Sequence, residues 1–335
     1  MTVFKKVMFI VILSIFVIAS VYLSFTVISR DTYEYEQQTD VGGTGVDGLV
    51  FCGFNGNLNT SEVRVYHPFV KNKNRTGDND AFVEDGTRTV VAIDKFTFVS
   101  DENMQYCYVG PDVAYIDEQA FFGCFALRAI IVDDANEYYT DVDGVLYTKD
   151  KTEILLYPTY HTEYLVKIGK VPENYYETHD ETYEIPEGVK RIATGCFYKT
   201  WGIKEITLPS TLESIGDMAF FKCESMLLTK LPDSLKEMGN DSFSYCKSMT
   251  GALFVPESVD SIGHHCFYKC EKLTGFYMGD KDESTIALGG KWQPKGENAF
   301  SAKPPVFGAV RADVESLNLK ALEEASKTTT LPEDK

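Results

Sequence analysis

The sequence predicts a β-rich solenoid of the α+β class, built from short coils that stack on one another. Phenylalanine returns at intervals of 23, 76, 23, 23 and 24 residues, and the residues around it repeat in the same order. The composition, 44% hydrophobic and 24% charged, is that of a folded chain. One such unit cannot bury its own apolar side, so it gains stability by stacking on its neighbours. The six phenylalanines are Phe98, Phe121, Phe197, Phe220, Phe243 and Phe267.

Each repeat reads as one coil, and residues 203–223 show it in full. Ile203 and Ile206 are expected to point inward from a strand, which Pro209 ends because proline cannot donate to a β ladder. Gly216 allows a turn conformation that bulkier residues avoid. A small residue and the phenylalanine then fill the core on the far side of the coil. Stacked coils of this kind predict one parallel sheet face along the solenoid.

The repeat has a recognisable order: aliphatic, proline, two residues, aliphatic, two residues, aliphatic, glycine, two residues, a small residue, phenylalanine, and cysteine three positions later. This order resembles the BspA-like leucine-rich repeat family of cell-surface proteins. The resemblance covers about residues 90–280 and implies a right-handed stack of leucine-rich repeat coils. Thr200 and Asp101 depart from it, because they stand at the cysteine position. The cysteines that follow the pattern are Cys124, Cys223, Cys246 and Cys270.

The 76-residue interval equals about three coils and therefore holds two irregular ones, which we expect as an insert over residues 132–184. Within it, residues 139–158 look like the hairpin that members of the family carry. Asp143-Gly144 is the turn of that hairpin, because this dipeptide favours the tight turns that join antiparallel strands.

The two ends of the solenoid are expected to be capped. Residues 49–90 alternate like a β-hairpin, which would cover the open edge of the first coil. The solenoid itself is expected over residues 91–310. Apolar residues at helical spacing predict a short closing helix and then a disordered tail over residues 311–335.

The N-terminus differs from the rest of the chain. Residues 7–28 hold no charged side chain and follow Lys5 and Lys6. A helix of this length crosses the ~30 Å hydrocarbon core of a membrane. We expect residues 1–6 in the cytoplasm, a transmembrane signal anchor over 7–28, a flexible stalk over 29–48 and the remainder outside the cell. The alternative is a cleaved signal peptide, in which case the protein is secreted.

Charge and motifs exclude several classes of function. The net charge of −18 opposes binding to nucleic acid, whose phosphates require a basic surface. His264 and His265 adjoin Cys266, but no second ligand pair stands at metal-binding spacing, so no metal is expected. Phosphate-binding glycine loops, nucleophile elbows and zinc-helix motifs do not occur in the sequence. We therefore expect neither a cofactor nor an enzyme.

The eight cysteines are explained largely by the repeat. Those at the repeat position are expected to form a ladder of small buried side chains, with Cys196 and Cys266 in a second ladder. Coils about 4.8 Å apart lie within disulfide range, although their parallel Cβ directions would strain a bond. Free thiols are therefore expected on the ladders. Cys52 and Cys107 lie off the ladders and are able to pair.

A binding surface is predicted on the outer side of the strands. Alternation sends every second residue outward, and the resulting columns are less polar than a solvated strand face should be. Cross-strand packing or coverage by the insert would also explain the columns. The predicted contact residues are Tyr106, Tyr108, Ile131, Lys230, Phe254 and Tyr277.

The tyrosine-rich insert is a second candidate surface, with Tyr139, Tyr147 and Tyr157 as its contact residues. The resemblance implies a surface-displayed, non-enzymatic recognition or adhesion protein that binds an extracellular protein or glycan and contacts the membrane through its N-terminal helix. The alternative is an envelope-associated scaffold or spacer that has no external ligand.

Overall fold

The computed structural model describes residues 32–55, 61–66, 69–71, 82–84, 88–175, 180–228, 230–280, 287–288, 305–309 and 311–328. The predicted cytoplasmic residues 1–6 and the predicted anchor 7–28 lie outside these ranges. Within them, no helix combines the length and the apolar character that crossing a membrane requires.

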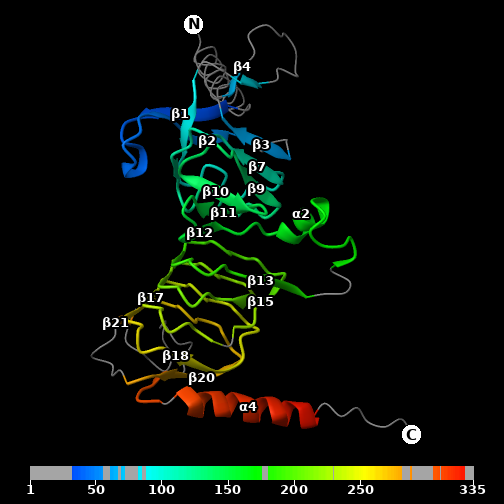
Figure 1. The fold of residues 1–335 in the computed structure, drawn as a ribbon, viewed down its shortest axis with the longest axis vertical. Coiled ribbons are helices and arrows are strands. Elements are labelled where there is room, and N and C mark those ends of the chain that lie inside the picture. Colours follow the sequence, from blue (N-terminus) through cyan, green and yellow to red (C-terminus); the bar gives the residue numbers. More distant parts are fainter. Residues whose placement is uncertain are drawn as a thin grey trace, which may run out of the picture.

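The coils stack into an elongated body with parallel strands on two faces (Figure 1). One face, which we call the strand face, carries the four- to six-residue strands of the repeats, and the other, which we call the short-strand face, carries their two-residue strands. The sequence predicted a single parallel face, and this was wrong. A strand such as Ser214–Ile215 is too short to show alternation, yet it pairs in parallel with Glu237–Met238 of the next coil.

The strand face holds the sheets β3 (Glu62–Val65), β7 (Tyr106–Val109), β9 (Ala129–Val132); β13 (Glu181–Glu184), β15 (Ile203–Thr207); and β18 (Gly251–Val255), β20 (Leu273–Met278), β22 (Pro305–Val306). The short-strand face holds β1 (Thr32–Gln38), β2 (Gly48–Asn55), β6 (Val90–Ile93), β8 (Tyr115–Ile116); and β10 (Tyr139–Val142), β11 (Val145–Thr148), β12 (Glu153–Leu156), β14 (Arg191–Ile192), β16 (Ser214–Ile215), β17 (Glu237–Met238), β19 (Ser261–Ile262), β21 (Ala287–Leu288). The remaining elements are a hairpin of β4 (Phe69–Lys71) and β5 (Phe82–Glu84), a turn η1 (Val41–Gly43), and the helices α2 (His161–Lys167) and α4 (Arg311–Thr328).

The N-terminal cap differs from the expected hairpin. β2 and β3 lie on different faces, where β2 pairs in parallel with β6 and β3 pairs in parallel with β7. Residues 48–65 therefore contribute a strand to each face, as a further coil does. β1, which falls in the predicted stalk, pairs antiparallel with β2 and covers its edge.

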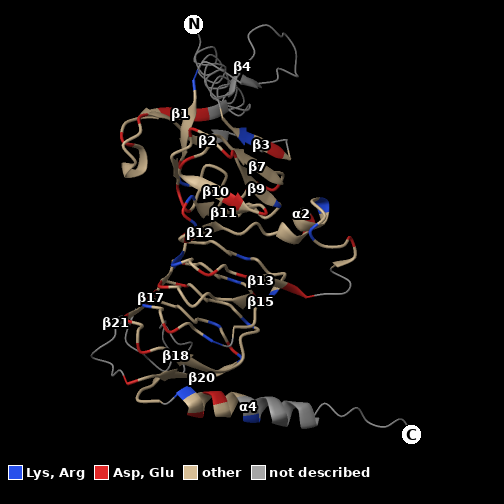
Figure 2. Ribbon diagram, in the orientation of Figure 1, with Lys and Arg blue, Asp and Glu red and all other residues tan. Residues whose placement is uncertain are grey.

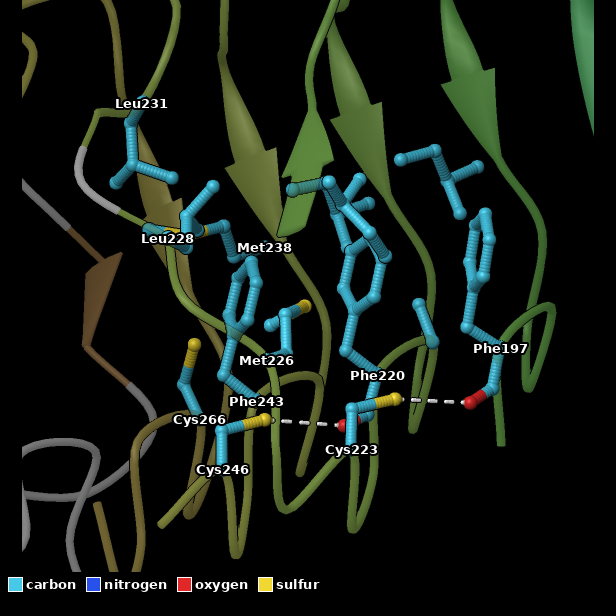
Figure 3. Close-up of a cluster of buried hydrophobic side chains, with 14 of the residues drawn as sticks. Phe197, Phe220, Cys223, Met226, Leu228, Leu231, Met238, Phe243, Cys246 and Cys266 are labelled. Carbon is cyan, nitrogen blue, oxygen red and sulfur yellow. Dashed lines mark hydrogen bonds between the residues drawn. The ribbon is translucent and has the colours of Figure 1, made fainter. Parts of the chain in front are cut away.

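The repeat phenylalanines stack as a ladder in two runs, Phe98 on Phe121 and Phe197 through Phe220 and Phe243 to Phe267. Ring centroids of Phe197 and Phe220, and of Phe220 and Phe243, lie 5.0 Å apart, with interplanar angles of 16° and 12°. Ladder cysteines follow the same line, and the thiol of Cys223 donates to the carbonyl of Phe197 at 3.0 Å (Figure 3). Cys246 repeats this bond to Phe220 at 3.1 Å. Each coil that carries a ladder cysteine is thus joined to the one before it by a ring contact and a thiol hydrogen bond.

Backbone bonds reinforce the ladder along what we call the turn wall, the turns around each repeat phenylalanine. Two residues before and after Phe220, Met218 (φ 52°) and Lys222 (φ 59°) adopt the left-handed conformation. Each costs about 1–2 kcal/mol for a non-glycine residue. With these two residues left-handed, three N–H groups of the turn point toward the next coil. The hydrogen bonds that they form there offset the conformational cost. Met218, Phe220 and Lys222 donate to the carbonyls of Asn240, Ser242 and Ser244 at 2.8, 2.7 and 2.8 Å.

The insert continues the core instead of leaving it. The predicted hairpin is present as β10 and β11, with Asp143 and Gly144 at its turn, and β12 then pairs in parallel with β14. The ring of Tyr157 stacks on Phe197 at 5.0 Å and takes the ladder position of the irregular coil. The closing helix is also present as α4, which lies at the C-terminal end of the stack (Figure 1).

The coil of Phe197, which follows the insert, carries a buried polar group without a partner at Thr200. This residue replaces a ladder cysteine, and its buried Oγ1 has no hydrogen-bond partner. An unpaired buried hydroxyl costs about 1–3 kcal/mol. Thr200→Val keeps the shape and should therefore raise the free energy of unfolding by about 1 kcal/mol, measured by chemical denaturation.

The matched control for this substitution is Thr211→Val. The hydroxyl of Thr211 donates to the carbonyl of Val189 at 2.8 Å and accepts from the N–H of Gly188 at 2.9 Å. This variant should lose stability. Equal destabilisation of both variants would show that the Thr200 hydroxyl is satisfied in solution.

Candidate binding surface

The predicted contact column lies on the outer side of the strand face. Tyr108, Phe254 and Tyr277 are half-buried, while their strand neighbours on both sides are buried. Ile131 is also half-buried, and Lys230 is exposed. Tyr108, Ile131, Phe254 and Tyr277 therefore lie on the outer side of their strands, as a period of two predicts, whereas Lys230 lies outside the described strands.

Helix α2 covers one end of this face. The ring of Tyr106 lies 6.2 Å from that of Tyr164, and the Lys167 ammonium lies 3.9 Å above it. Tyr106 is only 6% exposed as a result. The structure contradicts its predicted contact role, because the insert folds over this part of the face.

Helix α4 covers the other end. The Arg311 guanidinium lies 4.7 Å above the ring of Phe254 and forms a hydrogen-bonded ion pair with Asp233. The side-chain amide of Asn318 bonds both backbone groups of Ala252, at 2.6 and 2.8 Å. The strand face is thus bounded by a helix at each end.

Between the two helices lies a groove of about 570 Å³. Its apolar part includes Leu227, which is 44% exposed. Three carboxylates and one ammonium group, that of Lys230, also line it. We name it the strand-face groove. Its lining residues are Glu187, Glu205, Ile206, Thr207, Leu208, Ser210, Leu227, Leu228, Lys230, Pro232 and Asp233.

The strand-face groove lies on a surface of mixed charge. Acidic and basic residues are interspersed along the coloured part of the ribbon in Figure 2. Binding here would therefore depend on individual charges in the groove. Sequence reasoning placed Lys230 at this site but missed Leu227 and Asp233, because only the lining of the groove distinguishes them from other surface residues.

The insert does not offer the predicted tyrosine surface. Tyr139, Tyr147 and Tyr157 are 8%, 0% and 3% exposed. The Tyr139 hydroxyl accepts the N–H of Ile116 at 2.9 Å, and burial raises the pKa of Tyr139 to about 12. The structure contradicts a contact role for these three tyrosines, which fill the core where regular repeats are absent.

A buried polar network joins three segments of the insert. The Tyr157 hydroxyl donates to Glu181 at 3.2 Å and lies 3.2 Å from His161 Nδ1. The other ring nitrogen of His161 lies 2.7 Å from the carbonyl of Asp143. Burial lowers the pKa of His161 and raises that of Glu181, so the network favours uncharged forms. These side chains join three segments and are enclosed in the core.

Other candidate chemistry gains no structural support within the described ranges. They contain no group of three or more His, Cys, Asp or Glu side chains placed to hold a metal ion. His264 is exposed, and His265 Nδ1 lies 3.9 Å from a carboxylate oxygen of Asp241.

Glu118 bridges the two regular stacks across the insert. One carboxylate oxygen lies 2.7 Å from the Arg191 guanidinium, and the other accepts the N–H of Thr194 at 2.7 Å. Burial raises the pKa of Glu118, but the bonds from Arg191 and Thr194 outweigh it and hold the pKa at about 2. The carboxylate is therefore part of the joint between the stacks.

Acidification should weaken this joint. A carboxyl group with a pKa of about 2 in the folded chain and 4.5 when unperturbed stabilises the fold above pH 4.5, and loses this effect as the pH falls toward 2. Glu118→Gln should lower the denaturation midpoint at pH 7. Between pH 5 and pH 2 the midpoint of this variant should fall less than that of the wild type. Glu137→Gln, at an exposed position, serves as the control. An unchanged pH profile in Glu118→Gln would refute the bridge.

All eight cysteines lie in the described ranges and are free thiols, including Cys52 and Cys107. Cys107 and the ladder cysteines are buried, whereas Cys52 is partly exposed. Burial, followed by the carboxylates of Glu36 and Asp94, raises the pKa of Cys52 to about 11. The thiols are therefore hydrogen-bond donors at neutral pH.

This arrangement predicts the reactivity of the native protein toward a thiol reagent. One thiol, Cys52, should be alkylated, and its rate should rise with pH toward 11 because only the thiolate reacts. Mass spectrometry identifies the labelled site. Denaturation should then expose the other seven thiols, for a total of eight labelled sites, and a smaller total would reveal a disulfide.

Stacked coils, parallel strands and a phenylalanine ladder define this chain as a leucine-rich repeat solenoid. The chain belongs to the BspA-type leucine-rich repeat family, whose sequence model matches residues 86–141 and 171–286 in six copies, just over half of the chain. A comparison with curated protein sequences found no match.

Two solved structures share the fold. The pneumococcal vaccine antigen PcpA is 24% identical over 58% of this chain and 44% of its own, with a TM-score of 0.50. A leucine-rich cell-surface protein of Faecalibacterium prausnitzii is 22% identical over 68% of this chain and 54% of its own, with a TM-score of 0.51. The present chain thus spans about half the length of these proteins. Likeness at this level concerns the fold alone.

Proposed function

We propose that this protein is a non-enzymatic recognition or adhesion protein that binds an extracellular protein or glycan through its strand face. The strand-face groove carries this proposal. It combines exposed apolar surface at Leu227 with charged groups, and this pairing is typical of interaction sites. Tyr108, Ile131 and Tyr277 extend the contact along the same face.

The proposed location is the cell surface, with residues 7–28 as a single membrane-spanning anchor and the C-terminal part outside. Residues 7–28 support it by their length and lack of charge. The Faecalibacterium protein is described as a cell-surface protein, which accords with this location. Cleavage after the apolar segment would give a secreted protein with the same strand face.

A scaffold or spacer without an external ligand is the second candidate. This candidate is favoured because aromatic rings of the strand face contact arginine side chains of the same chain. Arg64 lies 4.4 Å above the ring of Tyr108, and Arg311 lies 4.7 Å above Phe254. Rings held in this way would stabilise the solenoid whether or not a partner binds.

The two candidates differ in the effect of Leu227→Lys combined with Glu205→Lys. Both side chains are exposed, so the fold should survive, as checked by circular dichroism. Adhesion of cells displaying this variant should fall more than tenfold, because an apolar contact and a charge are lost from the groove.

Val99→Lys is the matched control, since Val99 is 49% exposed and lies on the turn wall. It should leave adhesion unchanged. Full adhesion by the folded groove variant would show that the groove is not the binding site. If the wild-type protein mediates no adhesion, the scaffold is favoured.

A further inference from the structure

The strand face is interrupted beside the strand-face groove. The sheet of β13 and β15 extends to Leu227 through a bridge to Glu205. β18 belongs to a separate sheet, in which it pairs with β20 and forms the edge. Two sheet edges therefore meet the groove region from opposite sides within the described chain.

Asn318 of α4 occupies the edge of β18 as a strand would. The N–H of Ala252 donates to Asn318 Oδ1 at 2.6 Å, and Asn318 Nδ2 donates to the Ala252 carbonyl at 2.8 Å. In a parallel strand the N–H and C=O of one residue point to the same side, here away from β20. A carboxamide offers the same donor and acceptor as a peptide group. The side chain thus imitates the backbone of a neighbouring strand.

The preceding glycine makes this approach possible. A Cβ atom on Gly251 would lie 2.6 Å from Asn318 Oδ1, and the φ of Gly251 is +83°, which side-chain-bearing residues rarely adopt. Gly251 therefore keeps the edge of β18 open to an incoming amide.

Arg311 provides the second attachment of α4. Its guanidinium bonds Asp233, a lining residue of the groove, and lies above Phe254 of β18. Helix α4 therefore presents two groups to the strand face, an amide at the sheet edge and a cation at the groove. Glu187 and Glu205 add two more carboxylates to the lining. The charge of the groove favours a cationic occupant.

The described side chains of α4 are mostly exposed. Among its described side chains Val314 alone is buried, whereas Ala312, Asp313, Glu315, Leu317 and Lys320 are exposed. The ion pair of Arg311 is at the surface, where such pairs contribute little. The described side chains of α4 thus bury less than the strands of the coils beneath, and segments with few buried contacts open more readily.

We propose that the edge of β18 is a strand-addition site that α4 occupies in the unbound protein, and that the partner is an extended peptide segment carrying an arginine. This inference rests on the proposed function, because it uses the same face. Asn318 follows Arg311 by seven positions along the helix, a rise of about 10.5 Å. An extended strand covers that distance in about three residues. The arginine of the partner therefore stands about three residues from the residue that pairs with Ala252.

The probe for this test is a fluorescent ten-residue peptide of alternating threonine and valine with one central arginine. The full-length Asn318→Ala variant should bind it at least tenfold more tightly than the wild type, as measured by fluorescence anisotropy, because the competing amide is gone. Asn318→Asp keeps the acceptor and should show a smaller gain. Lys320→Ala, an exposed change on the same helix, should show none.

Two further measurements locate the peptide. Adding Asp233→Asn to Asn318→Ala should reverse most of the gain, and replacing the arginine of the peptide by glutamate should abolish binding. Hydrogen exchange at the Ala252 amide should accelerate in Asn318→Ala and slow again when the peptide is added. Equal affinity of wild type and Asn318→Ala, or binding without protection of Ala252, would overturn the proposal.

The results also separate this inference from the proposed function. Loss of adhesion in the groove variant, together with unchanged peptide affinity in Asn318→Ala, would leave the proposed function standing and refute strand addition. Tighter peptide binding in Asn318→Ala, together with full adhesion by the groove variant, would support strand addition and refute the groove as the adhesion site.

Discussion

Contact between successive coils is the constraint on which the rest of this structure depends. The stacked ring of each repeat phenylalanine, the thiol bond beside it and the N–H groups of the turn wall all connect one coil to the next. No coil is large enough to bury these groups alone. The cost of left-handed residues such as Met218 and Lys222 is offset only when a neighbour is in place. Local geometry and stacking are therefore inseparable.

The same constraint explains why the sequence predicted some parts of the fold and not others. The phenylalanines and ladder cysteines recur at fixed positions, so their burial followed from spacing alone. The buried ring of Tyr157 stacks on Phe197 as a ladder phenylalanine would, but the sequence around Tyr157 does not follow the repeat. A cluster of tyrosines in an irregular segment resembled a surface. Only the structure shows that the irregular coils must also supply core rings.

The binding surface was also predictable only in part: the side of the strands on which it lies followed from the sequence, but its extent did not. Alternation placed Tyr108, Phe254 and Tyr277 on the outer side of their strands, because a strand has a strict period of two. Which parts of that side stay open depends on α2 and α4, whose docking is a tertiary contact without a local signal. The pairing of Asn318 with Ala252 joins residues far apart in the chain, and an asparagine on a polar helix gives no sign of it. The accessible area is thus decided by the two helices.

The turn wall is directional. N–H groups of each coil point to the carbonyls of the following coil, and the ladder thiols donate in the opposite sense, to the preceding one. A coil can therefore join the stack in one orientation only. Two copies related by a twofold axis through an end of the wall would bring donors against donors, or acceptors against acceptors. End-to-end growth through this wall is consequently head-to-tail, and a symmetric dimer must use a side of the solenoid.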